Sequence, residues 1–321
     1  MADQRIKYTE AMVGALKPGT EDTLNRLSLV DHKEDGSHRD ANYRGVNNIF
    51  IGNNAGTLNT GIYNVFIGKD SGGSNAGGSD NTFVGYCAGK NNSSGFANSF
   101  FGEATGYNNT IGSKNTFVGM NAGFSNTDGD KNTFVGEGAG YYNTSGDFNT
   151  FVGEGAGASN TTGSYNTFMG ISTGFSNDIG SDNTFIGVNA GVFNTSGNRN
   201  TFLGIKSGRN NISGSGNTFV GIDSGTSCTV GSANVFIGAN SGAKETGDNK
   251  LYISNSETDR PLIYGEFDNA KLKINGEFGV SQPYTIGSAA GGASITLPTY
   301  AIGFLKFTLG GTSIRVPYYN P

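Results

Sequence analysis

A five-residue phrase, Asn-Thr-Phe-Val-Gly or a close variant, returns every 17 residues through most of this chain. The first interval is 16 residues and each later one is 17. A spacing this strict predicts a stacked architecture in which each repeat contacts only its neighbours, because an insertion would break the stack. The twelve copies begin at Asn48, Asn64, Asn81, Asn98, Asn115, Asn132, Asn149, Asn166, Asn183, Asn200, Asn217 and Asn234.

The composition suits a repeat better than a compact globule. Glycine accounts for 54 of 321 residues and the hydrophobic fraction is 35%, which is poor in core-forming side chains. Because the glycines recur at fixed positions, the composition does not indicate disorder, which needs polarity without a period. The net charge of -5 provides no basic stripe, so we expect no nucleic-acid partner.

The segment that begins the sequence lacks the apolar run of a secretory signal, and no stretch approaches the ~18–20 apolar residues of a membrane helix. We therefore expect synthesis in the cytoplasm, without secretion or membrane insertion, and reduced thiols. Cys87 and Cys228 lie eight repeats apart. At roughly 4.8 Å per stacked strand they would be about 38 Å apart, so we expect no disulfide between them.

One repeat, residues 149–165, indicates the shape of a single coil. Its first five residues favour a β-strand, since they hold a phenylalanine beside a β-branched residue. Gly153, Gly157 and Gly163 stand at offsets that recur in nearly every copy, and we expect them to supply positive φ at tight corners. The repeat predicts an all-β fold, a parallel β-solenoid or β-roll with a firm strand and a looser return strand. The handedness stays open.

Both faces of the predicted strand are apolar. Phenylalanine is third in all twelve copies, and the next residue is almost always aliphatic or Met. Because side chains alternate along a strand, the two columns face opposite ways and both need burial. We expect a parallel homotrimer in which phenylalanine fills each coil and the aliphatic column lines the three-fold axis; the reverse assignment stays open. These columns include Phe117, Phe134, Phe151, Phe185, Val118, Val135, Val152 and Ile186.

Two asparagine columns are expected to be structural. The asparagines that open each copy would hydrogen-bond to one another along the stack, as amide ladders do in cross-β assemblies. A second column would lie where the chain turns, since asparagine tolerates left-handed conformations. Its members are Asn92, Asn109, Asn126, Asn143, Asn160, Asn177, Asn194 and Asn211.

The repeat divides the chain into four segments. Residues 1–46 do not repeat and are interpreted as an attachment segment, and residues 47–248 form the solenoid shaft. Residues 249–282 hold short strands that would cap the exposed strand edge of the shaft. Residues 283–321 read as a small β-hairpin tip. Its aromatic residues are candidates for receptor contact: Tyr284, Tyr300, Tyr318 and Tyr319.

The repeat, with Ala-Gly three residues after the strand as in Ala122-Gly123, resembles those of bacteriophage tail fibre proteins. It is also similar to the β-roll heads of trimeric autotransporter adhesins. Residues 7–15 and 22–27 look like the virion-attachment end of phage fibres, and residues 249–276 are similar to the cap that precedes a C-terminal chaperone in many of them. The resemblance implies a trimeric virion component bound to the tail or baseplate through its N-terminus, which contacts a polysaccharide or protein on the host surface.

No arrangement of residues indicates an enzyme, a cofactor or a metal site. Glu137 and Glu154 occupy equivalent places on adjacent coils, but other coils carry apolar residues there, so we expect a solvated rim. His32 and His38 are the only histidines, and we expect both in an exposed polar loop. Both lie outside the repeats, so neither could activate a serine there.

Two alternatives of different class remain open. A regular threonine column could order water and make this an ice-binding protein, although we expect those threonines to share the partly buried face of the aliphatic column. A bacterial surface adhesin is the third hypothesis. The threonines are Thr82, Thr116, Thr133, Thr150, Thr167, Thr184, Thr201 and Thr218.

Overall fold

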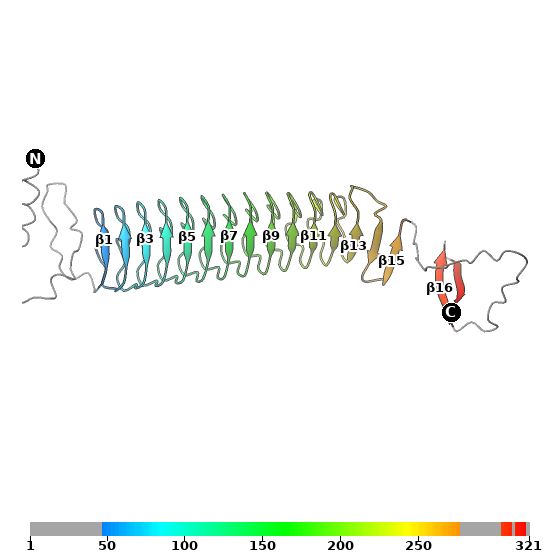
Figure 1. Ribbon diagram of the computed structural model, residues 1–321, viewed down its shortest axis with the longest axis horizontal. Helices are drawn as coiled ribbons and strands as arrows, with labels where there is room; N and C mark the ends of the chain where they lie inside the picture. The colour runs from blue at the N-terminus through cyan, green and yellow to red at the C-terminus, as the bar shows by residue number, and fades with distance from the viewer. Residues whose placement is uncertain (1–46, 277–302, 310–311, 319–321) are drawn as a thin grey trace, which may run out of the picture. The chain divides into compact units, whose positions relative to one another are not determined.

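The computed structural model describes residues 47–276 and the strands 303–309 and 312–318. The chain divides into two compact units, residues 1–277 and 278–321. In the first unit, fifteen strands form one sheet in sequence order (Figure 1), and the described residues contain no helix. Twelve strands belong to the repeat: β1 Ile49–Ile51, β2 Val65–Ile67, β3 Thr82–Val84, β4 Ser99–Phe101, β5 Thr116–Val118, β6 Thr133–Val135, β7 Thr150–Val152, β8 Thr167–Met169, β9 Thr184–Ile186, β10 Thr201–Leu203, β11 Thr218–Val220 and β12 Val235–Ile237.

Each repeat forms one coil of a parallel β-solenoid. Neighbouring strands pair in register, so that Phe117 lies beside Phe134 and Val118 beside Val135. The predicted all-β parallel solenoid of 17-residue coils is confirmed, but the expected return strand is wrong, since the return segments of the described coils form turns. These turns are still joined from coil to coil, as where the amide of Gly123 donates to the carbonyl of Ala139 at 2.9 Å.

The core of each coil is its phenylalanine. We number coil positions from the opening asparagine, position 1, which puts this residue at position 3. From Phe66 to Phe236 every ring is fully buried. Successive rings in that column stack with centroids 4.6–4.9 Å apart and planes within 8°. The inward assignment is therefore confirmed for Phe117, Phe134, Phe151 and Phe185, and the reverse assignment is wrong.

The glycine at position 9 makes room for the ring. A Cβ atom on Gly157 would lie 2.5 Å from a ring carbon of Phe151, and Gly157 has a φ of 57°. The expectation for Gly163 is wrong, because its φ is not positive. Gly163 is required by proximity instead, since a Cβ there would lie 2.3 Å from the carbonyl oxygen of Gly180.

Two corners of the coil are left-handed without depending on glycine. Positions 7 and 17 have φ values between 49° and 61° in almost every coil, and they hold residues as different as Cys87, Lys131 and Tyr165. Side chains other than glycine pay about 1–2 kcal/mol for this conformation. The sequence did not indicate these corners, because their residue types vary from coil to coil.

The asparagines of position 1 bond to one another along the stack, as expected, but chiefly from a backbone amide to a side-chain oxygen. At position 1, Asn149 accepts the amide of Asn166 on the next coil at 3.0 Å and donates to the carbonyl of Gly163 at 2.8 Å. The ladder of amides lies at position 12, where Asn160 donates to Asn143 at 2.8 Å. No asparagine at position 12 has a positive φ, so the left-handed expectation is wrong.

Both cysteines are buried and free, as expected. Cys228 stands at position 12, where other coils carry the ladder asparagine. Burial raises the pKa of its thiol to about 12, so the side chain stays neutral. It has no amide to donate downward, and the Oδ1 atom of Asn211 on the preceding coil is buried without a hydrogen-bond partner. The ladder of asparagine amides at position 12 therefore ends at Asn211, one coil before Cys228.

Three more strands close the C-terminal end of the sheet. They are β13 Lys250–Ile253, β14 Ile263–Glu266 and β15 Lys271–Ile274. β13 is parallel to β12 and sets Tyr252 beside Phe236, so this strand is a degenerate last copy of the repeat. β14 and β15 are antiparallel. The Tyr252 ring meets that of Phe236 edge-on, with centroids 5.3 Å apart, and its hydroxyl donates to Glu245 at 2.8 Å, so the parallel stack of rings ends here.

The second unit contains a two-stranded antiparallel sheet, β16 Gly303–Leu309 and β17 Thr312–Tyr318. These two strands lie where the sequence predicts the hairpin, and the tip of residues 283–321 as a whole stays a prediction. Of the tip candidates, Tyr318 ends β17, whereas Tyr284, Tyr300 and Tyr319 lie outside the described residues. The predicted attachment segment 1–46 and its two histidines also lie outside them.

Replacing Phe151 by alanine is expected to lower the free energy of unfolding by about 3–5 kcal/mol, because the rings above and below cannot close the space. Chemical denaturation followed by circular dichroism measures the change. Thr162→Ala on the same coil, at an exposed position, should change it by less than about 0.5 kcal/mol. Equal effects of the two substitutions would contradict the phenylalanine core.

Replacing Cys228 by asparagine is expected to raise the free energy of unfolding by about 1 kcal/mol, because the new amide would satisfy Asn211. Asn234 already donates to the sulfur of Cys228 at 3.5 Å and would donate to the new Oδ1 atom instead. The same denaturation experiment measures the gain. Cys228→Ser, which keeps a small side chain, should give no such gain, and a loss of stability in Cys228→Asn would contradict the ladder.

Candidate functional site

The outer face of the parallel strands is the longest uniform surface of the shaft. Positions 2 and 4 flank the buried phenylalanine and point outward, as their partial exposure shows. Val118 is 37% exposed, whereas Val135, Val152 and Ile186 are half-buried. No charged residue occurs at either position in the twelve coils. We call this surface the strand face.

The threonines of position 2 share the strand face with the aliphatic column, as expected. Thr116, Thr184 and Thr201 are exposed and the other members are half-buried. They lie directly beside one another in the parallel register, for example Thr133 beside Thr150. The strand face is therefore a ladder of hydroxyl groups next to a ladder of methyl groups.

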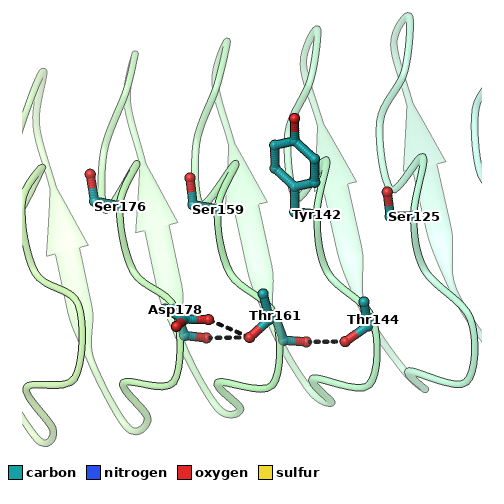
Figure 2. A pocket seen from close by; sticks show the side chains of 7 residues that line it. All are labelled: Ser125, Tyr142, Thr144, Ser159, Thr161, Ser176 and Asp178. Carbon is teal, nitrogen blue, oxygen red and sulfur yellow. Dashed lines mark hydrogen bonds between the residues drawn. The ribbon is translucent and has the colours of Figure 1, made fainter.

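A shallow groove of about 530 Å³ runs along a second face, over four neighbouring coils. Figure 2 shows two rows of side chains along it, one from position 11 and one from position 13. Between the rows lies the buried asparagine of position 12, which fixes both rows to the amide ladder. The lining residues are Ser125, Tyr142, Thr144, Ser159, Thr161, Ser176 and Asp178.

The two rows differ in how their hydroxyl groups are used. At position 13 the Thr144 hydroxyl donates to the carbonyl of Thr161 at 3.0 Å, and the Thr161 hydroxyl donates to Asp178 (Figure 2). At position 11 the hydroxyls of Ser159 and Ser176 make no hydrogen bond to any described residue. The hydroxyl groups of Thr144 and Thr161, at position 13, therefore join neighbouring coils. The hydroxyl groups of Ser159 and Ser176, at position 11, are available to bind solvent.

Tyr142 is the largest side chain of the groove. It is 55% exposed, and its ring meets that of Tyr141 edge-on at 4.6 Å between centroids. Tyr141 in turn stacks on Phe124 at 5.0 Å. The tyrosine therefore stands on an aromatic column at position 10, which holds it away from the coil.

The strand face carries no charged side chain at positions 2 and 4, and the groove carries one, that of Asp178. Glu137 and Glu154 are exposed at position 6, on the rim where the sequence placed them. No serine of the groove is hydrogen-bonded to Asp178. The described part of the chain contains no cluster of three or more His, Cys, Asp or Glu side chains that could hold a metal ion. It also contains no helix able to cross a membrane.

The sequence located the strand face but missed the groove. The aliphatic column repeats in every coil, so its period makes it visible. The groove depends on positions 11 and 13, where residue types vary and only the buried asparagine between them is regular.

Comparison with known proteins does not assign the chain to a family. No protein-family model, curated protein or solved structure matches this chain.

Replacing Thr144 by valine is expected to lower the free energy of unfolding by about 0.5–1.5 kcal/mol, because a hydrogen bond between two coils is lost. Ser159→Ala, which removes a hydroxyl without a protein partner, should change it by less than about 0.5 kcal/mol. Thermal or chemical unfolding of the two variants measures the difference. A larger effect from Ser159→Ala would mean that the roles of the two rows are reversed.

Proposed function

We propose that this chain is a structural, non-catalytic component of a homotrimeric fibre of the phage tail fibre type. The shaft acts as a spacer, residues 1–46 attach it to a tail or baseplate protein, and the C-terminal end faces the host. The protein then belongs to the virion, and three parallel copies repeat each weak contact with a surface polysaccharide or protein, which strengthens binding by multivalency.

One observation carries this proposal. The strand face is free of charge at positions 2 and 4 over twelve coils, and it stays partly exposed on a single chain. A long row of partly exposed apolar side chains such as the position 4 column is uncommon on monomers and marks a site of association. A fibre of parallel copies would cover the stripe along its whole length.

The position 4 column supplies only a modest free energy of association. A fully buried aliphatic side chain contributes ~1.5–3 kcal/mol, but within one chain six of the position 4 residues are already half-buried and the other six are at most 45% exposed. Covering what remains of twelve of them contributes on the order of 10 kcal/mol per chain. Association itself costs about 4–15 kcal/mol, so this column alone would give only a reversible bundle.

The full chain is expected to sediment at three times its mass of 33.3 kDa. Sedimentation equilibrium over a range of concentrations measures this.

A chain that lacks residues 283–321 should remain trimeric but lose adsorption to the host when it is built into particles. Unchanged adsorption would contradict the role of the tip in host contact. A full-length chain that is monomeric at every concentration would contradict the fibre.

Ice binding is the second candidate, because eight threonines stand in register on the outer strand face. Thermal hysteresis separates the two functions. A fibre component should show none, since its threonines lie at the contact between copies. Hysteresis that is lost in Thr150→Lys would favour the ice-binding alternative.

A further inference from the structure

The strand face carries no charge in any of the twelve coils, whereas position 6 changes from charged to apolar along the shaft. Position 6 follows position 4 across the glycine of position 5, and it is exposed in most coils. In the first seven coils this position is mostly polar or charged. From the coil of Asn166 onward it is apolar in every copy, and its four large members there are 38–51% exposed. The first group is Asn53, Lys69, Tyr86, Glu103, Met120, Glu137 and Glu154, and the second is Ile171, Val188, Ile205, Ile222 and Ala239.

Position 2 is apolar at both ends of the shaft, since Ile49 and Val65 occupy it in β1 and β2. Threonine or serine fills it from β3 to β11, and then Val235 and Leu251 replace threonine. The antiparallel register continues this row through Gly265 to Leu272, which is 65% exposed. A Cβ on Gly265 would lie 3.1 Å from the Cβ of Leu251, so glycine leaves room for the leucine.

Position 4 also continues into the cap. Ile237 pairs with Ile253, which pairs with Ile263 and then with Ile274. All four residues of β15 are exposed, including Ile274 at 39%. The apolar surface is therefore widest over the C-terminal coils and extends past the last repeat.

We propose that copies of this chain hold one another chiefly along the C-terminal part of the strand face, from the coil of Asn166 through β15. The proposal rests on the fibre function above and names the part of the shaft that holds the copies together. It supplies the additional apolar contact that the position 4 column lacks. The charged side chains at position 6 of the earlier coils, such as Lys69, Glu103 and Glu137, then remain exposed to solvent in the bundle.

The regular spacing of the apolar side chains on this surface indicates that the partner is another copy of the chain. Apolar side chains one strand spacing apart over several coils pack in register only against a surface with the same spacing. A second shaft supplies that spacing. The uniform part of the stripe permits a slip by one coil, whereas the cap residues Leu272 and Ile274 meet their own counterparts in one alignment alone. The C-terminal zone thus fixes the register of the bundle.

The test places the same charge in the same column at two heights of the shaft. Ile205→Glu with Ile222→Glu alters the C-terminal zone, and Tyr86→Glu with Met120→Glu is the matched control. Glutamate occupies position 6 naturally at Glu103, Glu137 and Glu154, so both variants should keep the fold, which circular dichroism verifies. Sedimentation equilibrium of the full-length chains then measures association.

The C-terminal pair should weaken association by about tenfold or more, and the control by less than about threefold. Equal weakening by both pairs would overturn the proposal, because the contact would then run evenly along the shaft. No change in either pair would also overturn it, since position 6 would lie outside the contact. If the unsubstituted chain is a 33.3-kDa monomer throughout, the fibre function itself fails, and this result is distinct from the other two.

Discussion

The spacing between hydrogen-bonded strands sets every other contact in the shaft. Adjacent strands lie about 4.7–4.9 Å apart, and the phenylalanine rings stack at 4.6–4.9 Å. The amides of position 12 hydrogen-bond across the same step. Because rings, amides and backbone all share one distance, an added residue in a middle coil would disturb all three. The two 16-residue coils accordingly stand at the ends of the repeat, at Asn48 and Asn234.

The period made most of the fold predictable. The phenylalanine column, the parallel register and the degenerate copy at Tyr252 all follow from residues that recur at one interval. The amide ladder at position 12 did not follow, because an amide column can bond to itself or to the backbone, and only geometry distinguishes Asn149 from Asn160. Gly163 was misread for a similar reason, since a missing Cβ serves both positive φ and close approach.

The surfaces were less predictable than the core. A single coil shows that Val152 faces outward, but it does not show how much of the side chain its neighbours cover. In the structure, the neighbouring residues of the same chain already leave the Val152 side chain half-buried. The groove beside Tyr142 needs four coils at once, and its positions vary too much to form a sequence pattern. The change along position 6, from Glu137 to Ile205, is visible in the sequence but has meaning only once that column is known to be exposed.

The interior and the outer face contribute separately to the shaft. The rings at position 3 bury themselves within one chain, so each chain has a continuous core of its own. The strand face lies outside that core, so the association that we propose would depend on the strand face and not on the rings. A substitution at position 6 is then expected to alter assembly while the coil is preserved.

The left-handed corners at positions 7 and 17 have a wider consequence. Their backbone conformation is held by the coils above and below, whatever side chain is present, since lysine, phenylalanine and tyrosine occupy position 17 in turn at Lys131, Phe148 and Tyr165. Mutation can therefore exchange these residues one at a time without moving the chain. Natural variation can accumulate at such corners and diversify what the rod displays, while its architecture is inherited unchanged.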